Sequence, residues 1–122
     1  RRELQDEFLD WFPVLKERAR QDAQTLSGGQ RKMLSFVMAL SSEPALVLLD
    51  EPTEGVAPVV RLQLVEALAK ITQRTSVVLV EQHVGFALRS TDQYHVLESG
   101  RITGSGAGGE AALDEVRAAL VV

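Results

Sequence analysis

Apolar residues along the chain change several times between helical and strand-like spacing. Residues 1–20 have helical spacing that is interrupted at Pro13, because proline disfavours helix for the residue before it. After a polar stretch, Ser27 suits the N-cap of a long helix over residues 28–43. That helix has one stripe of Leu34, Val37, Met38 and Ser41 and another of Met33, Phe36 and Leu40. We therefore expect it to be buried on two sides.

Two short apolar runs, residues 45–50 and 76–81, predict strands that are covered on both faces. Pro58 suits the first turn of a helix between them that runs to about residue 73. The inward residues of this helix would be Leu64, Leu68 and Ile71. The alternation of strands and helices predicts an α/β fold with a mainly parallel sheet flanked by helices.

The last forty residues predict a hairpin and two more helices. A short helix over 83–90 precedes a strand over 93–99, and Ser99-Gly100 turns the chain into a hairpin partner beginning at Arg101. A last helix is expected over residues 110–120. His95 falls inside the predicted strand and is interpreted as an ordinary strand side chain.

The glycine-rich stretch 104–109 partly matches the sequence patterns of two nucleotide-binding motifs. Gly104, Gly106 and Gly109 satisfy G-x-G-x-x-G, and the first and last of them have P-loop spacing. However, Glu110-Ala111 stands where a P-loop requires Lys-Ser/Thr, which would put a carboxylate beside phosphates. A dinucleotide site would need a second strand and an acidic residue about 20 residues further on. We interpret the stretch as a flexible loop.

Composition and charge narrow the classes of function. The net charge of −4, from 17 acidic and 13 basic residues, gives no electrostatic reason to expect nucleic acid as a partner. The absence of cysteine excludes disulfides and thiolate metal sites. No apolar run approaches the roughly 20 residues that span a bilayer, and the charged opening is not a secretory signal. We expect a soluble chain whose association with a membrane is peripheral.

Two acidic residues follow the first predicted strand. Asp50 ends that strand, where α/β sheets place ligands, and Glu51 comes next. An aspartate in this position suits the coordination shell of Mg²⁺, and a neighbouring glutamate can polarise a water for attack. Alternatively, the strand simply ends in solvated acids, and the pair alone does not distinguish these interpretations.

The stretch Leu26-Ser27-Gly28-Gly29-Gln30 begins the long helix. Its two glycines leave the first helical N–H groups open, and these groups together with the helix dipole attract an anion. Alternatively, the stretch is a flexible helix start capped by serine. The acidic pair that follows in the sequence favours the phosphate-binding interpretation.

Residues 26–58, LSGGQRKMLSFVMALSSEPALVLLDEPTEGVAP, resemble the signature motif, Walker B strand and following loop of ABC ATPases. The flanks WFPVLKER, VVLVEQHVGFALRSTDQYHVLESGRI and DEVRAAL resemble the ATP-binding subunits of branched-chain amino acid importers, and urea importer ATPases share the EQ…FA stretch. The resemblance covers nearly the whole chain but only the C-terminal half of the family's nucleotide-binding domain. It implies an incomplete P-loop NTPase-like fold. Residues 1–42 would end the helical subdomain, 43–103 would carry the Walker B and switch strands, and 104–122 would be the glycine-rich loop and C-terminal helix.

The resemblance also implies ATP and Mg²⁺ as cofactors. Asp50 would bind Mg²⁺ through water, and Glu51 would be the general base. Ser27, Gly28 and Gly29 would contact the γ-phosphate of an ATP held by the opposing subunit, with Gln30 closing the motif. The implied partners are a second ABC ATPase subunit, identical or different, transmembrane permease subunits and, indirectly, a solute-binding protein. The implied location is cytoplasmic, peripheral on the inner face of the cell membrane.

Two positions depart from the common family pattern. Ala57 stands where an aspartate commonly communicates across the dimer, which puts that coupling in doubt. At the switch position, Gln82 occupies the place of the usual histidine and His83 comes one residue later. Branched-chain importer ATPases often carry Gln here, so Gln82 is the favoured contact to the γ-phosphate. His83 replaces it if the strand bulges by a residue, and is otherwise a helix-start residue.

The resulting hypothesis is a part of the ATP-hydrolysing subunit of an importer for branched-chain amino acids or a similar small polar solute. The P-loop lysine and serine are not among these 122 residues, so we expect the chain alone neither to bind ATP tightly nor to hydrolyse it. An unpaired apolar edge at residues 76–81 should favour association. The alternatives are a urea importer ATPase, a non-transport ABC ATPase acting on DNA or ribosomes, and a non-catalytic dimerisation module. The acidic charge balance argues against the DNA- or ribosome-linked alternative, and retention of Glu51 argues against the non-catalytic one.

Overall fold

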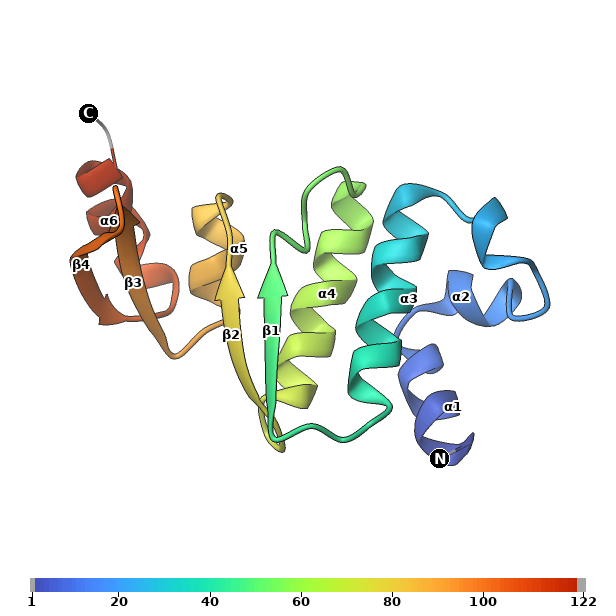
Figure 1. The fold of residues 1–122 in the computed structure, drawn as a ribbon. Coiled ribbons are helices and arrows are strands. Elements are labelled where there is room, and N and C mark those ends of the chain that lie inside the picture. The colour runs from blue at the N-terminus through green and yellow to red at the C-terminus, as the bar shows by residue number, and fades with distance from the viewer. Residues whose placement is uncertain (1, 121–122) are drawn as a thin grey trace.

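The computed structural model describes residues 2–120 as alternating helices and strands (Figure 1). In chain order the elements are α1 (Arg2–Asp10), α2 (Pro13–Glu17), the 3-10 helix η1 (Ala23–Thr25), α3 (Gly28–Leu40), β1 (Leu46–Asp50), α4 (Pro58–Ile71), β2 (Ser76–Val80), α5 (Val84–Arg89), β3 (Gln93–Glu98), β4 (Arg101–Ala107), the 3-10 helix η2 (Glu110–Ala112) and α6 (Leu113–Leu120). The predicted α/β class and the break between the first two helices at Pro13 are confirmed. No helix in the described part of the chain is long and apolar enough to cross a membrane.

The strands form two separate pairs. Strands β1 and β2 are parallel, in continuous register from Leu46 opposite Ser76 to Asp50 opposite Val80. Strands β3 and β4 form the predicted antiparallel hairpin, and α5 connects the two pairs. Because β1 and β2 run in the same direction, the residues that follow Asp50 and Val80 emerge at the same edge of the sheet.

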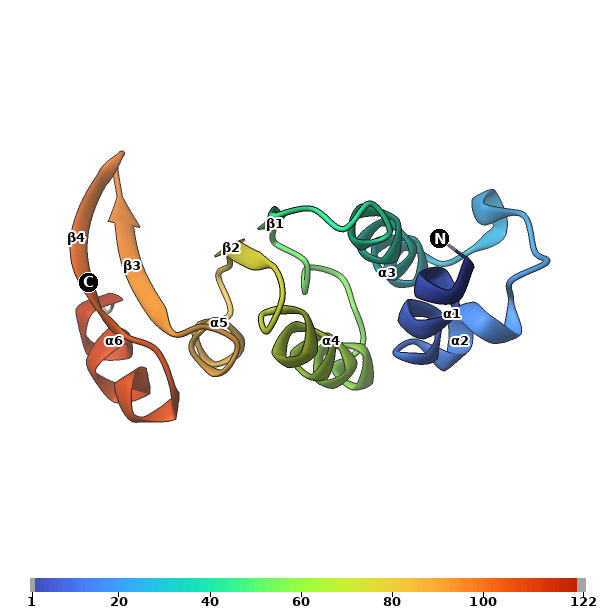
Figure 2. The same ribbon diagram turned by 90° about the horizontal axis from the view of Figure 1, so that it is seen from below.

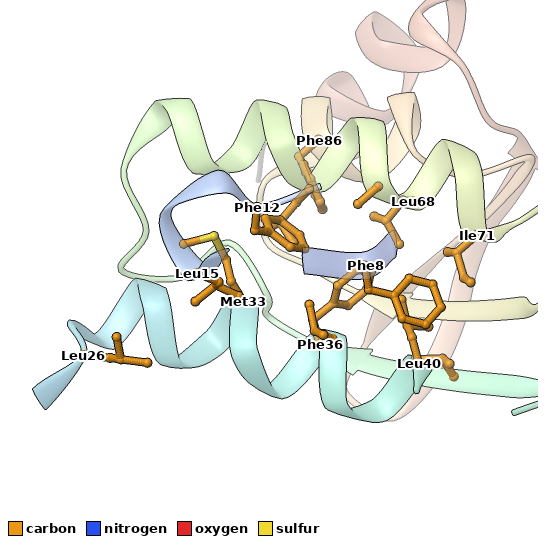
Figure 3. Close-up of a cluster of buried hydrophobic side chains, with 14 residues drawn as sticks. Phe8, Phe12, Leu15, Leu26, Met33, Phe36, Leu40, Leu68, Ile71 and Phe86 are labelled. Carbon is orange, nitrogen blue, oxygen red and sulfur yellow. The ribbon is translucent and has the colours of Figure 1, made fainter. Parts of the chain in front are cut away.

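The main core lies between helices α1 to α5 and one face of the parallel pair (Figure 3). Its buried side chains are Phe8, Phe12, Leu15, Leu26, Met33, Phe36, Val37, Leu40, Val47, Leu64, Ala67, Leu68, Ile71 and Phe86. The residues predicted to face inward from α4 are among them. A smaller cluster of Leu88, Val96, Ala112 and Val116 lies under the hairpin. Each large apolar side chain buried in this way contributes about 1.5–3 kcal/mol to folding.

The expectation that both strands are covered on two faces is wrong. Figure 2 shows α4 and α5 on one side of β1 and β2, and within residues 2–120 no element covers the other side. The side chains on that bare face are 50–72% exposed: Leu46, Leu48, Val78 and Val80. Successive residues of a strand point to opposite faces, so helices packed on one face leave every second residue open.

The expectation that α3 is buried on two sides is also wrong. Met33, Phe36, Val37 and Leu40 are buried, whereas Met38 is 66% exposed. The buried residues follow the i, i+3, i+4, i+7 pattern of a single helical stripe. Helices α1 and α2 pack against α3, and Met38 lies outside the stripe that they cover.

The glycine-rich stretch is not a loop throughout, because β4 continues through residues 104–107. Val96 pairs with Gly104 and Tyr94 pairs with Gly106. A Cβ on Gly106 would come within 3.0 Å of the Tyr94 ring, so glycine allows the ring to lie over the strand. The predicted last helix begins as a turn of 3-10 helix before α6.

Candidate functional site

The carboxyl ends of β1 and β2 and the N-terminus of α3 lie at the same edge of the molecule (Figure 1). Asp50 ends β1 opposite Val80 and is exposed. Ser27, the N-cap of α3, is exposed as well. The topology therefore brings the acidic pair and the Ser-Gly-Gly stretch to one side of the fold.

Glu51 leaves β1 in a left-handed conformation, with a φ of 45°. Its N–H group donates a hydrogen bond to the carbonyl oxygen of Val80 at 2.8 Å, one residue beyond the end of the strand. A non-glycine residue with positive φ costs roughly 1–2 kcal/mol, and such residues cluster at functional sites. The conformation turns the chain out of the strand while the backbone of Glu51 stays attached to β2.

The side chain of Glu51 meets that of Gln82, which follows β2. Gln82 Nε2 donates a hydrogen bond to Glu51 Oε1 at 2.6 Å. The register of β1 and β2 is continuous to the end of both strands, so no bulge carries His83 into this position. His83 instead occupies the N-cap of α5, and its side chain makes no capping hydrogen bond. The structure thus brings Gln82 to Glu51 and places His83 at the start of a helix.

A second contact between the same two segments involves Thr53 and Glu81, which the sequence analysis missed. Glu81 Oε1 accepts hydrogen bonds from Thr53 N at 2.9 Å and from Thr53 Oγ1 at 2.5 Å. Glu81 Oε2 accepts one from the backbone N–H of His83 at 3.2 Å. Thr53 is fully buried. A glutamate at the end of a predicted apolar strand was the available signal, but the sequence does not indicate its partner.

The same hydrogen bonds affect the charge of Glu81. Burial raises the pKa of this carboxyl, but the hydrogen bonds from the Thr53 side chain, the Thr53 backbone and the His83 backbone outweigh burial. The charge of His83 acts in the same direction, and the pKa of Glu81 lies below its ordinary value of 4.5. Glu81 is therefore a carboxylate at neutral pH.

The start of α3 is a capping box, so the predicted N-cap is confirmed. Ser27 Oγ accepts from the N–H of Gln30 at 3.3 Å, and Gln30 Oε1 accepts from the N–H of Ser27 at 3.0 Å. The N–H groups of Gly28 and Gly29 belong to the first turn of the helix, where no intrahelical acceptor is available. The position of a Cβ on Gly28 is open space. These two N–H groups can therefore receive an anion.

Lys32 connects this helix to the loop that carries Glu51. Its Nζ donates hydrogen bonds to the carbonyl oxygens of Glu51 at 3.1 Å and of Glu54 at 2.6 Å. Val56, from the same loop, is buried and lies 3.4 Å from where a Cβ on Gly29 would be. The helix start and the acidic loop therefore pack as one unit, a contact that the sequence analysis did not anticipate.

The residue at position 57 departs from the family pattern. Ala57 is the N-cap of α4 and is exposed, so an apolar methyl group stands where a carboxylate was expected from the family pattern.

The exposed Asp50 carboxylate fits Mg²⁺, which usually takes one or two carboxylates together with phosphate oxygens and water. Among the side chains that the structure describes, those of residues 5–120, no group of three or more His, Cys, Asp or Glu gathers to hold a metal.

These features define the class of protein. Residues 2–54 match the family described as "ABC transporter". The solved structure of MJ1267, an ATP-binding cassette of an ABC transporter, has a TM-score of 0.79 to this chain at 26% identity. The match covers 95% of this chain and 46% of that one. Sequence and fold together place the chain in the ABC ATPase family, as the resemblance predicted.

Among curated proteins, the chain is 46% identical to the high-affinity branched-chain amino acid transport ATP-binding protein BraG of Pseudomonas aeruginosa, over 80% of this chain and 42% of the relative. It is 36% identical to the probable branched-chain amino acid transport ATP-binding protein LivF of Archaeoglobus fulgidus, over 86% of this chain and 45% of the relative. It is also 36% identical to a phosphate import ATP-binding protein, PstB 1 of Yersinia pestis, over 75% of this chain and 34% of the relative. The chain therefore spans less than half the length of these relatives.

Proposed function

We propose that this chain is part of the ATP-binding and ATP-hydrolysing subunit of an ABC importer for branched-chain amino acids or a similar small polar solute. The observation that carries the proposal is the hydrogen bond from Gln82 to Glu51 at the end of β1. A carboxylate at this place, held by an amide that follows the next strand, suits the role of a general base in phosphoryl transfer.

Each residue of the site has a role in hydrolysis. Glu51 accepts the proton of the attacking water, and the hydrogen bond from Gln82 orients the carboxylate. The Gln82 amide retains a second N–H for the γ-phosphate. Asp50 would hold Mg²⁺ through water, and the metal ion would neutralise charge on the phosphate oxygens.

The start of α3 serves a second nucleotide, held by the opposing subunit. The Ser27 and Gln30 side chains are engaged in the capping box, which leaves the N–H groups of Gly28 and Gly29 for that phosphate. The residues of this chain thus supply parts of two sites in a dimer. This is why we propose a second ABC ATPase subunit as partner and expect the 122 residues alone to be inactive.

The transported solute is assigned from the relatives. Identity to a branched-chain amino acid transport protein is 46%, against 36% for a phosphate import protein, so amino acids are favoured and phosphate is the second candidate. Transmembrane permease subunits and a solute-binding protein complete the proposed assembly. The proposed location is the inner face of the cell membrane.

The test compares MgATP hydrolysis by the complete protein that contains this chain, in its native assembly, with that of two variants. Glu51→Gln removes the proposed base and should lower turnover about 100-fold or more. Glu98→Gln is the matched control, because Glu98 ends another strand and is exposed. Equal turnover by wild type and Glu51→Gln would rule out the proposed role.

A further inference from the structure

We infer that Glu81 is a positioning residue whose carboxylate joins the loop after β1 to the turn after β2 and so holds Gln82 against Glu51. The contacts of Glu81 are independent of the proposed function, but the effect on catalysis rests on it. The inference concerns how the two residues at the reacting centre keep their relative position.

The first step is the way the two segments are linked. Glu81 receives both donors of Thr53 on one oxygen and the N–H of His83 on the other. Thr53 lies two residues after Glu51, and Glu81 directly precedes Gln82. The Thr53–Glu81 and Gln82–Glu51 contacts therefore close a small ring that contains both segments.

The second step is burial. Thr53 has no exposed surface, so water cannot replace a partner that its N–H and hydroxyl groups lose. Strands β1 and β2 stop at Asp50 and Val80, and the ladder adds only the hydrogen bond from Glu51 N to Val80 O. Beyond that bond, the two segments are joined by the Gln82–Glu51 contact and by the Glu81 carboxylate, and of these two it is the Glu81 contact that has a fully buried partner, Thr53.

The third step is the chemistry of the acceptor. Three donors converge on the Glu81 side chain, and an ionised carboxylate accepts on both oxygens without presenting a donor of its own. A glutamine would have the same shape but would turn an NH₂ group toward Thr53 or toward His83. One of the two segments would then lose its attachment. The lowered pKa of Glu81 agrees with this arrangement.

The consequence for catalysis is specific. Loss of the attachment frees the backbone at residues 81–83 and lets the Gln82 amide move away from Glu51. Displacement of a catalytic group by about 1 Å can cost about 100-fold in rate. Glu81 and Thr53 act through Gln82, which also bears the proposed contact to the γ-phosphate, so kcat should fall by a larger factor than the KM for MgATP rises.

The kinetic experiment uses the complete protein in its native assembly with Glu81→Gln, Thr53→Val and Thr53→Ser. We expect kcat to fall about 10- to 100-fold in Glu81→Gln and Thr53→Val, with a smaller change in KM. In Thr53→Ser, which keeps the hydroxyl, kcat should stay close to that of wild type. The controls are Glu98→Gln and Thr103→Val, both at exposed positions of the hairpin. Equal losses in Thr53→Val and Thr53→Ser, or no loss in Glu81→Gln, would overturn the inference.

A structural readout separates this inference from the proposed function. Crystal structures of the same variants report whether Gln82 Nε2 still contacts Glu51 Oε1, whatever the activity. We expect the contact to be lost in Glu81→Gln and kept in Thr53→Ser. Absence of turnover in the wild type would refute the proposed function and leave this readout to decide the role of Glu81. An unchanged contact in both Glu81→Gln and Thr53→Val would refute the positioning role.

Discussion

Lys32 Nζ lies 2.6 Å from the carbonyl oxygen of Glu54 and 3.1 Å from that of Glu51, so a helix that starts at a candidate phosphate site is attached to the loop of the candidate base. The ammonium group of Lys32 is also 3.9 Å from the Glu54 carboxylate. The lysine side chain is 39% exposed, so the bonds to the carbonyls, more than the ion pair, are expected to carry the stabilisation.

Replacement of Lys32 by methionine should loosen this loop. The variant keeps an apolar stem of similar length but loses two donated hydrogen bonds, which should lower the free energy of unfolding by about 1 kcal/mol. Amide hydrogen exchange should accelerate at Val56, whose N–H bonds to the carbonyl of Thr53 within the loop. The control is Lys16→Met, whose ion pair with Asp10 is exposed and should contribute little. Equal exchange at Val56 in wild type and Lys32→Met would contradict the prediction.

Substitutions at Ser27 separate the cap from the phosphate contact. Ser27→Ala removes the acceptor of the Gln30 N–H and should destabilise the protein by about 1 kcal/mol in urea unfolding. Ser27→Asp preserves a capping oxygen and should keep the stability. Its negative charge should nevertheless weaken ATP-dependent dimerisation of the complete protein, measured by sedimentation. If ATP-dependent dimerisation of the Ser27→Asp variant equals that of wild type, the predicted contact between a phosphate and this helix start is wrong.

The bare face of β1 and β2 should make the 122-residue chain associate in solution. Leu48 is 72% exposed and Val78 is 50% exposed on that face, and β2 has an unpaired edge in the described structure. Leu48→Lys should shift sedimentation toward the monomer. The control is Leu62→Lys, because Leu62 on α4 is 65% exposed but lies away from the strands. A wild-type chain that sediments as a stable monomer at high concentration would contradict the prediction.

The lowered pKa of Glu81 predicts a dependence of stability on pH. A carboxyl with a pKa lower in the folded than in the unfolded state stabilises the fold above the unfolded value. That contribution should disappear as the pH falls from about 4.5 through the folded pKa. Thermal unfolding of wild type and Glu81→Gln between pH 3 and 7 should therefore show the largest difference near neutrality. A difference that stays constant down to pH 3 would show that the ionisation of Glu81 does not contribute.

Much of the local structure could be predicted from the sequence because it depends on neighbours along the chain. Short-range rules account for the N-cap at Ser27, the start of α4 at Pro58 and the hairpin turn at Ser99-Gly100. The strand that continues through Gly104 was missed, because glycine has a low strand propensity. The pairing of Gly104 with Val96 across the hairpin nevertheless holds this stretch in a strand conformation.

The sequence by itself determined the α/β class, the placement of Asp50-Glu51 at the end of a strand and the placement of Ser27-Gly28-Gly29 at the start of a helix. Only the tertiary structure decided that Gln82 meets Glu51, that Glu81 binds Thr53 and that Lys32 reaches the loop after β1. Those contacts depend on the register of β1 and β2 and on how α3 packs. These contacts join residues 19 to 31 positions apart in the chain, a separation at which local periodicity carries no information.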